Sequence, residues 1–155
     1  MIRIEKILYP TDFSSYSNQA YFHAISLAVT HYASLTVLFV YTPDIVTPGA
    51  PDNEEQARAY WQKQLEQIRP LDATIPVRHV LLEGDPAGEI VRYGRDANVD
   101  LIVMGTHGRT GLERLLLGSV AEQVLRDAAC SVLVVKLPKG QPVTERGDVA
   151  VAGRN

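Results

Sequence analysis

The sequence predicts an α/β protein built on one open parallel sheet of five strands with helices on both faces, a Rossmann-like arrangement. Short runs rich in β-branched residues alternate with segments of helical period, the pattern of parallel strands joined by crossover helices. Most of these runs are apolar without alternation, which is typical of strands buried on both faces. The length of 155 residues and the hydrophobic content of 46% suit a single packed domain.

The N-terminal part of the chain predicts a strand, a helix and a second strand. Lys6 to Tyr9 and Leu35 to Val40 are continuous apolar runs of strand length. Between them, Ser15 to Tyr32 repeats alanine at helical spacing, and Ser14 or Ser15 is available as the cap.

A loop and a second helix follow. Thr42 to Pro51 contains three prolines and a glycine, which predict an irregular connection. Asn53 to Ile68 has apolar residues at helical spacing, behind a pair, Asp52 and Glu55, that predicts a capping box. The apolar stripe that includes Trp61 predicts packing against the core.

The third strand is followed by a clear helix start. Val77 to Leu82 is the strand candidate. Asp85 followed by Pro86 is typical of an N-cap and a first-turn proline, and this short helix is predicted to end near Ala97.

The C-terminal part predicts two strands, Leu101 to Met104 and Ser131 to Val135, with a helix that begins near Ser119 between them. After Pro138 the sequence has scattered proline and glycine without a sustained period. We therefore expect one domain over residues 1–137 and a flexible tail over 138–155, with a short strand at Val149 to Ala152 as an open alternative.

Charge and composition narrow the class of protein. A formal net charge of −3 argues against a nucleic-acid binder, which normally carries a marked basic excess. The start of the chain lacks the apolar core of a signal peptide, and no apolar stretch approaches the roughly 18 residues of a membrane helix. We expect a cytoplasmic protein that engages neither nucleic acid nor membrane.

Cys130 is the single cysteine, so the chain cannot form an intramolecular disulfide. We expect Cys130 to be a small buried side chain.

Two loops at strand ends indicate a ligand site. Ligands of doubly wound sheets bind outside the carboxyl ends of the strands, where the strand order reverses. Pro10 to Asp12 follows the first strand, and a glycine-rich segment from Gly105 to Ser119 follows the fourth. Glycine lets backbone N–H groups approach an anion, and Gly118 with Ser119 opens a helix whose N-terminus favours phosphate. The sequence therefore predicts a polyphosphate site.

Asp12 has a different expected role, because a carboxylate repels phosphate unless a metal ion intervenes. A ribose, an adenine edge or Mg²⁺ would be its partner. Taken singly, these residues also have structural explanations that stay open: Gly105 and Gly108 as turns, Ser119 as a helix cap, and Asp12 as the cap of the first helix.

Several familiar motifs are absent from the sequence. GxxxxGK[ST] does not occur, which excludes a P-loop, and Gly105, Gly108 and Gly111 form GxxGxxG rather than the dinucleotide fingerprint GxGxxG. Neither HExxH nor GxSxG occurs, which removes the simplest metalloprotease and esterase hypotheses.

The spacing Gly105-x2-Gly108-x9-Gly118-Ser119 resembles the nucleotide-binding signature of the universal stress protein family, in its ATP-binding branch. The resemblance extends to KILYPTDFS from Lys6, to DLIVMGTHGRTGLERLLLGSVAEQVLR from Asp100 and to CSVLVVK from Cys130, in the order and separation of that family. It covers Lys6 to Lys136.

The resemblance implies the strand order 3-2-1-4-5, so that the loops after the first and fourth strands face each other. It also implies ATP as the ligand, with AMP or ADP as alternatives and Mg²⁺ as the accompanying ion. By the family's pattern, the adenosine end of the ligand would be lined by Pro10, Thr11, Asp12 and Val40. The ribose and the α-phosphate would be flanked by Met104 and Gly105. The phosphates would be surrounded by Gly108, Arg109, Gly118, Ser119 and Val120.

The resemblance further implies a homodimer formed through Ser131 to Lys136, which would pair antiparallel with its twin and protect an apolar edge strand. The leading hypothesis is a nucleotide-dependent regulatory or sensor protein of the stress response, with an unidentified protein partner.

Two other functions stay open. The first is a weak ATPase or autophosphorylating enzyme, in which Arg109 and Arg114 would help but no convincing base accompanies them, since His107 is expected to be a solvent-exposed loop residue. The second is an interaction module that holds AMP or no nucleotide.

Overall fold

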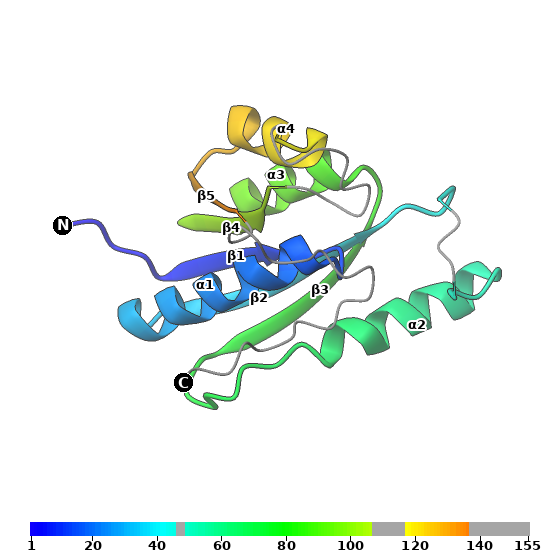
Figure 1. Cartoon of the computed structure of the whole chain (residues 1–155), viewed down its shortest axis with the longest axis horizontal. Helices are drawn as coiled ribbons and strands as arrows, with labels where there is room; N and C mark the ends of the chain where they lie inside the picture. The colour runs from blue at the N-terminus through cyan, green and yellow to red at the C-terminus, as the bar shows by residue number, and fades with distance from the viewer. Residues whose placement is uncertain (46–48, 107–116, 137–155) are drawn as a thin grey trace.

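The computed structural model describes residues 1–45, 49–106 and 117–136, and these confirm the α/β fold. Strands and helices alternate along the described chain (Figure 1). In order they are β1 (Lys6–Pro10), α1 (Ser15–His31), β2 (Ser34–Tyr41), α2 (Glu54–Glu66), β3 (Val77–Glu83), α3 (Pro86–Asp96), β4 (Leu101–Gly105), α4 (Ser119–Asp127) and β5 (Ser131–Val135).

The five strands form one parallel sheet in the order β3-β2-β1-β4-β5. The chain moves outward from β1 through β2 to β3, then returns to the other side of β1 to form β4 and β5. The strand order therefore reverses between β1 and β4, whose register pairs Ile7 with Leu101 and Leu8 with Ile102. The predicted order 3-2-1-4-5 is confirmed, and the carboxyl ends of β1 and β4 lie side by side at the switch point.

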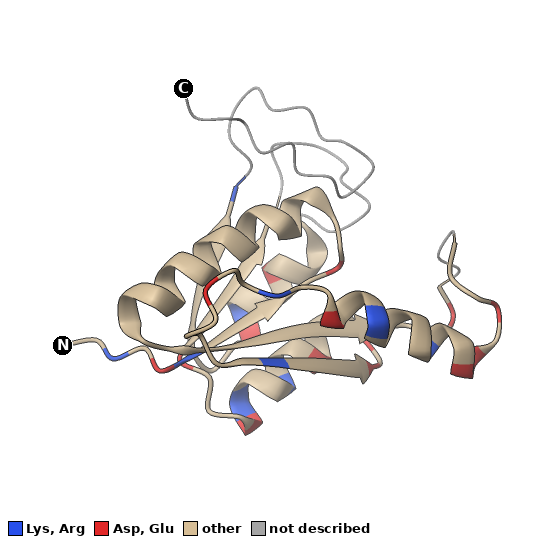
Figure 2. Cartoon of the chain, turned by 90° about the horizontal axis from the view of Figure 1, so that it is seen from below, with Lys and Arg blue, Asp and Glu red and all other residues tan. Residues whose placement is uncertain are grey.

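Helices cover both faces of the sheet, which explains why the strands are apolar without alternation. On one face, Tyr9 and Val37 belong to a buried cluster with the α2 side chain of Trp61. On the other face, Leu8 and Ile102 pack with α3 and α4 side chains. Charged residues lie mainly on the helices and connections in Figure 2, and the strands are mostly uncharged.

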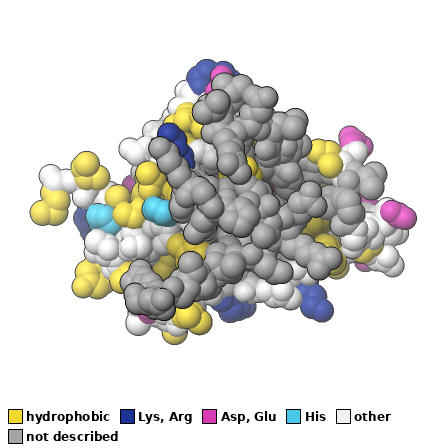
Figure 3. Space-filling view, viewed as in Figure 1, with side chains coloured by type: hydrophobic (Ala, Val, Ile, Leu, Met, Phe, Trp, Pro, Cys, Tyr) yellow, Lys and Arg dark blue, Asp and Glu magenta, His cyan; other side chains and the backbone are white. Residues whose placement is uncertain are grey.

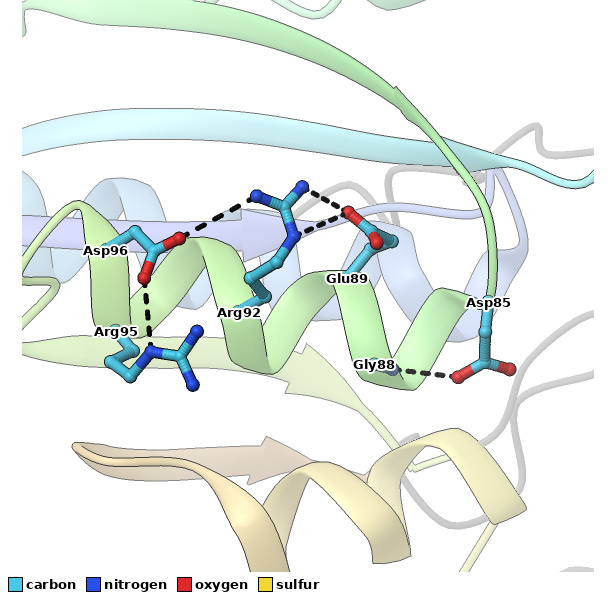
Figure 4. A network of polar contacts seen from close by, with 6 residues as sticks. All are labelled: Asp85, Gly88, Glu89, Arg92, Arg95 and Asp96. Carbon is cyan, nitrogen blue, oxygen red and sulfur yellow. Dashed lines mark hydrogen bonds and ion pairs between the residues drawn. The ribbon is translucent and has the colours of Figure 1, made fainter.

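The starts of α1 and α3 agree with the sequence analysis. The Ser14 hydroxyl accepts the backbone N–H of Ser17 at 3.3 Å at the start of α1. The Asp85 carboxylate accepts the N–H of Gly88 at 2.9 Å, and Pro86 occupies the first turn of α3 (Figure 4). Both helices thus begin with a side chain that satisfies one of the otherwise unpaired N–H groups.

The predicted capping box at α2 is wrong by one residue. The N-cap is Asn53, whose side-chain oxygen accepts the N–H of Gln56 at 3.1 Å. Asparagine caps helices as well as aspartate does, so the local pattern with Asp52 and Glu55 did not by itself decide which residue begins the helix.

The outer surface of α3 carries a series of ion pairs (Figure 4). Arg92 pairs with Glu89 and lies 3.7 Å from Asp96, which in turn lies 3.1 Å from Arg95. The carboxylate of Glu89 raises the pKa of the Arg92 guanidinium. Because Arg92, Arg95 and Asp96 are exposed, we expect the pairs to contribute little to stability.

The remaining surface is mixed in character. On the face seen in Figure 3, the coloured hydrophobic side chains are interspersed with polar and charged ones.

Cys130 is half-buried rather than fully buried, and burial raises the pKa of its thiol, which agrees with an unreactive cysteine. Among the described helices, none is long and apolar enough to cross a membrane.

Candidate functional site

The candidate residues that the structure describes gather at the carboxyl edge of the sheet, beside the switch point. They come from four places: the end of β1, the end of β2, the end of β4 and the start of α4. The set is Pro10, Thr11, Asp12, Val40, Met104, Gly105, Gly118, Ser119 and Val120. Gly108 and Arg109, together with His107, Gly111 and Arg114, lie outside the described residues.

The start of α4 is joined directly to the end of β4. The backbone N–H of Gly118 donates to the carbonyl oxygen of Thr106 at 2.7 Å. Residues separated by the glycine-rich segment are therefore adjacent in space. This contact brings the N-terminus of α4 to the edge at which β1 ends.

The N-terminus of α4 has no side-chain cap. Its N-cap is Gly118, in an extended conformation with φ −62° and ψ 154°, and Ser119 is already the first helical residue. The hypothesis that Ser119 caps this helix is therefore wrong, because the capping position falls one residue earlier. The Ser119 side chain is exposed and Val120 is half-buried, so both border the uncapped helix end.

Gly105 is required by the packing of α1 against β4. A Cβ atom placed on Gly105 would lie 2.7 Å from the carbonyl oxygen of Tyr16 and 2.8 Å from its carbonyl carbon. The sequence analysis offered a turn or an anion contact for this glycine and missed the helix backbone. No local signal reports this requirement, because Tyr16 is distant from Gly105 in the sequence.

A chain of buried hydroxyl groups lies directly beneath the loop that follows β1. The Tyr9 hydroxyl donates to the carbonyl oxygen of Ser17 at 2.9 Å and lies 2.8 Å from the Ser17 hydroxyl, which is 2.7 Å from the Thr11 hydroxyl. Thr11 also accepts the backbone N–H of Phe13 at 3.0 Å.

One direction in this chain is set by chemistry: the Tyr9 hydroxyl proton goes to the carbonyl oxygen of Ser17, which can only accept. The Ser17 hydroxyl is hydrogen-bonded to the hydroxyl groups of both Tyr9 and Thr11. The Thr11 hydroxyl is therefore engaged inside the core, and the residue is only 5% exposed.

The Tyr9 phenol is held in its neutral form. Burial raises the pKa of the Tyr9 hydroxyl far above its ordinary value, and the hydrogen bond with Ser17 offsets only part of this effect. The hydroxyl chain is accordingly uncharged over the physiological range of pH.

Asp12 lies between two anchored neighbours. Its carboxylate accepts the backbone N–H of Ser14 at 2.9 Å, and Ser14 rather than Asp12 caps α1, so the predicted alternative role of Asp12 as the helix cap is wrong. On the far side, Phe13 has a positive φ of 62°. Its ring stacks on Trp61 with centroids 5.4 Å apart and meets Phe39 edge-on at 4.9 Å. The half-buried Asp12 is thereby held at the edge of the sheet.

Val40 and Met104 contribute mainly to the core. They are 8% and 6% exposed and belong to the cluster beneath α3 and α4. Any contact with a ligand is limited to the small surface that each still presents at the sheet edge.

The described part of the chain contains no group of three or more His, Cys, Asp or Glu side chains that could hold a metal ion. Mg²⁺ commonly binds through one or two carboxylates together with substrate phosphates and water. Asp12 suits that arrangement, as the single carboxylate of the candidate set.

Taken together, the sheet order and these loops define a doubly wound α/β protein with its candidate ligand site at the switch point between β1 and β4. Residues 3–136 match the universal stress protein family, and the chain belongs to that family. A universal stress protein of Methanocaldococcus jannaschii, MJ0531, is 41% identical over 142 residues, which cover 87% of this chain and 84% of the relative.

Solved structures show the same fold. Universal stress protein UspA from Lactobacillus plantarum has a TM-score of 0.73 at 28% identity, covering 86% of this chain and 98% of that one. The Methanocaldococcus jannaschii protein MJ0577 has a TM-score of 0.72 at 31% identity, covering 90% and 100%. Two more distant structures, a universal stress protein in complex with cAMP and one from Archaeoglobus fulgidus in complex with dAMP, share the fold at 21% and 18% identity.

Proposed function

We propose that this universal stress protein binds an adenine nucleotide, primarily ATP, between the ends of β1 and β4 and acts as a nucleotide-dependent regulatory protein in the stress response. The observation that carries the proposal is the uncapped N-terminus of α4, joined to β4 through Gly118 and Thr106 beside the loop that holds Asp12. An anion-binding helix end and a carboxylate at one sheet edge match the two ends of a nucleotide.

The phosphates would lie at the start of α4. Its N-cap residue, Gly118, has no side chain to accept from the first N–H groups of the helix, and the helix dipole favours negative charge there. The exposed Ser119 hydroxyl would add a further donor. We assign the same phosphate end to Gly108 and Arg109, on the strength of their place in the signature.

The adenosine would lie nearer β1. The Asp12 carboxylate would accept from a ribose hydroxyl or an adenine amine, or would face a Mg²⁺ ion held by the phosphates. Because the Thr11 hydroxyl is hydrogen-bonded inside the core, Thr11 would contact the nucleotide through its backbone. Two universal stress proteins of this fold were solved with cAMP and dAMP, so an adenine nucleotide is compatible with the fold.

We further propose that the protein forms a homodimer through β5. This strand is at one end of the sheet order, with Leu133 exposed and Val132 and Val134 half-buried. Pairing with a second copy would hydrogen-bond the backbone of β5 on the side away from β4 and cover these apolar side chains.

Calorimetric titration of the nucleotide-free full chain with ATP in the presence of Mg²⁺ tests the proposal. We expect saturable binding of about one nucleotide per chain, weakened about tenfold by Ser119→Ala, which removes one hydrogen bond to a charged group. Ser26→Ala, the same change at an exposed position of α1, should leave the affinity unchanged.

Two results would count against this function. An absence of saturable binding would favour a nucleotide-free interaction module. Phosphate release proportional to protein concentration, and lost together with binding in Ser119→Ala, would favour the ATPase alternative.

A further inference from the structure

Ser17, in the first turn of α1, contacts both strand ends that border the proposed nucleotide site. Its hydroxyl lies 2.7 Å from the hydroxyl of Thr11, which follows β1. Its backbone nitrogen is 3.2 Å from the position that a Cβ atom on Gly105 would take at the end of β4. Ser17 is only 4% exposed, so it is shielded from a bound ligand. The first turn of α1 therefore packs against the ends of both strands.

Thr11 depends on Ser17 for a buried hydrogen-bond partner. The Thr11 hydroxyl is hydrogen-bonded to the Ser17 hydroxyl, and its oxygen also accepts the N–H of Phe13. A buried hydroxyl that loses its partner is costly, and the side chain turns toward another partner when it can. If Thr11 turns, the N–H of Phe13 loses its acceptor as well.

Asp12 is the residue between these two anchors. Its position follows from the conformation of Thr11 on one side and from the positive φ of Phe13 on the other. A change at Ser17 would therefore reach the Asp12 carboxylate through Thr11.

We infer that Ser17 is a positioning residue for nucleotide binding, which holds Thr11 and thereby Asp12 in the conformation that binds. This inference rests on the proposed function, since the affinity concerned is that for an adenine nucleotide. When the binding conformation is only partly populated, the apparent affinity falls in proportion to that population.

The test compares three variants of the full chain. Ser17→Ala removes the hydroxyl that is hydrogen-bonded to Thr11. Tyr9→Phe removes a hydroxyl from the same buried chain but keeps the contact between Ser17 and Thr11. Ser26→Ala makes the same serine-to-alanine change at an exposed position of α1. Two quantities are measured: the ATP affinity in Mg²⁺, and the hydrogen-exchange rate of the Phe13 amide by NMR without nucleotide.

We expect Ser17→Ala to weaken ATP binding about three- to tenfold and to speed exchange of the Phe13 amide, at a temperature at which every variant is folded. Tyr9→Phe should lower the thermal midpoint while leaving both quantities unchanged, and Ser26→Ala should change none of the three. A Ser17→Ala variant that loses thermal stability alone, with wild-type affinity and exchange, would overturn the inference.

The experiment also separates this inference from the proposed function. If the wild-type chain binds no ATP, the proposed function fails, and the Phe13 amide then decides only whether Ser17 has the structural role of holding Thr11 in place. Unchanged exchange of that amide in Ser17→Ala would overturn the role, and faster exchange in that variant alone would support it.

Discussion

The carbonyl oxygen of Tyr16 occupies the space that a side chain on Gly105 would need, at 2.7 Å from the position of a Cβ atom. The first turn of α1 therefore packs backbone against backbone with the end of β4. This contact sets how closely the first turn of α1 approaches the end of β4.

Replacing Gly105 by alanine should destabilise the fold. The added methyl group meets a helix backbone that cannot rotate away, and we expect a loss of about 2 kcal/mol, within the range for overpacked core positions. Urea unfolding followed by circular dichroism gives the free energy. Gly94→Ala is the matched control, because its Cβ atom would meet the end of the Ile102 side chain at an ordinary 3.4 Å and alanine favours a helix. Equal losses in both variants would contradict this account of Gly105.

The buried Tyr9 phenol should reduce stability at alkaline pH. Its pKa is raised by burial in the folded chain, so above the ordinary value of 10.0 the unfolded chain loses a proton that the folded chain keeps. The free energy of unfolding is unaffected by this group below that pH and falls as the pH rises above it. Urea unfolding across this range should show a shallower alkaline decline for Tyr9→Phe than for the wild type. Parallel curves would show that the Tyr9 pKa is not raised.

The cap of α2 offers a test of adjacent residues. Asn53→Ala removes the side-chain oxygen that accepts the N–H of Gln56, and should cost about 1 kcal/mol of stability. Asp52→Ala should cost little, since Asp52 is exposed and precedes the cap. Both free energies of unfolding are measured under one set of conditions. If the helix began at the predicted capping box, Asp52→Ala would cost more stability than Asn53→Ala.

Chelation of Mg²⁺ should separate ATP from AMP. ATP presents the β- and γ-phosphate oxygens that hold Mg²⁺, whereas AMP does not, so removal of the ion should weaken only ATP binding. Titrations with each nucleotide, with and without EDTA, give the four affinities. Asp12→Asn should reduce the effect of Mg²⁺ on ATP if the carboxylate faces the ion, and should leave it intact if Asp12 faces the ribose or adenine.

A charge on β5 should prevent the proposed dimer. Leu133→Lys places an ammonium group on the exposed edge strand, where pairing would bury it. Sedimentation velocity should then show a monomer, whereas Leu71→Lys, a fully exposed position between α2 and β3, should keep the wild-type mass. A dimer in both variants would place the interface elsewhere.

The sequence by itself determined the order of strands and helices, because apolar runs and helical periods report burial wherever they occur along the chain. It also determined the family, since the glycine spacing from Gly105 to Ser119 and the segment from Pro10 to Asp12 belong to a signature that local residues carry. The start of α3 at Asp85 and Pro86 was predictable for the same reason.

Only the tertiary structure decided why Gly105 must be glycine, how the Thr11 hydroxyl is used and which residue begins α2. Gly105 depends on a helix that meets its strand from a distant part of the chain. The role that we infer for Ser17 arises because the first turn of α1 packs against the ends of both β1 and β4, and no spacing in the sequence encodes those contacts. Side-chain pattern reports which surfaces are buried, whereas the contacts that shape a site arise from how those buried surfaces come together.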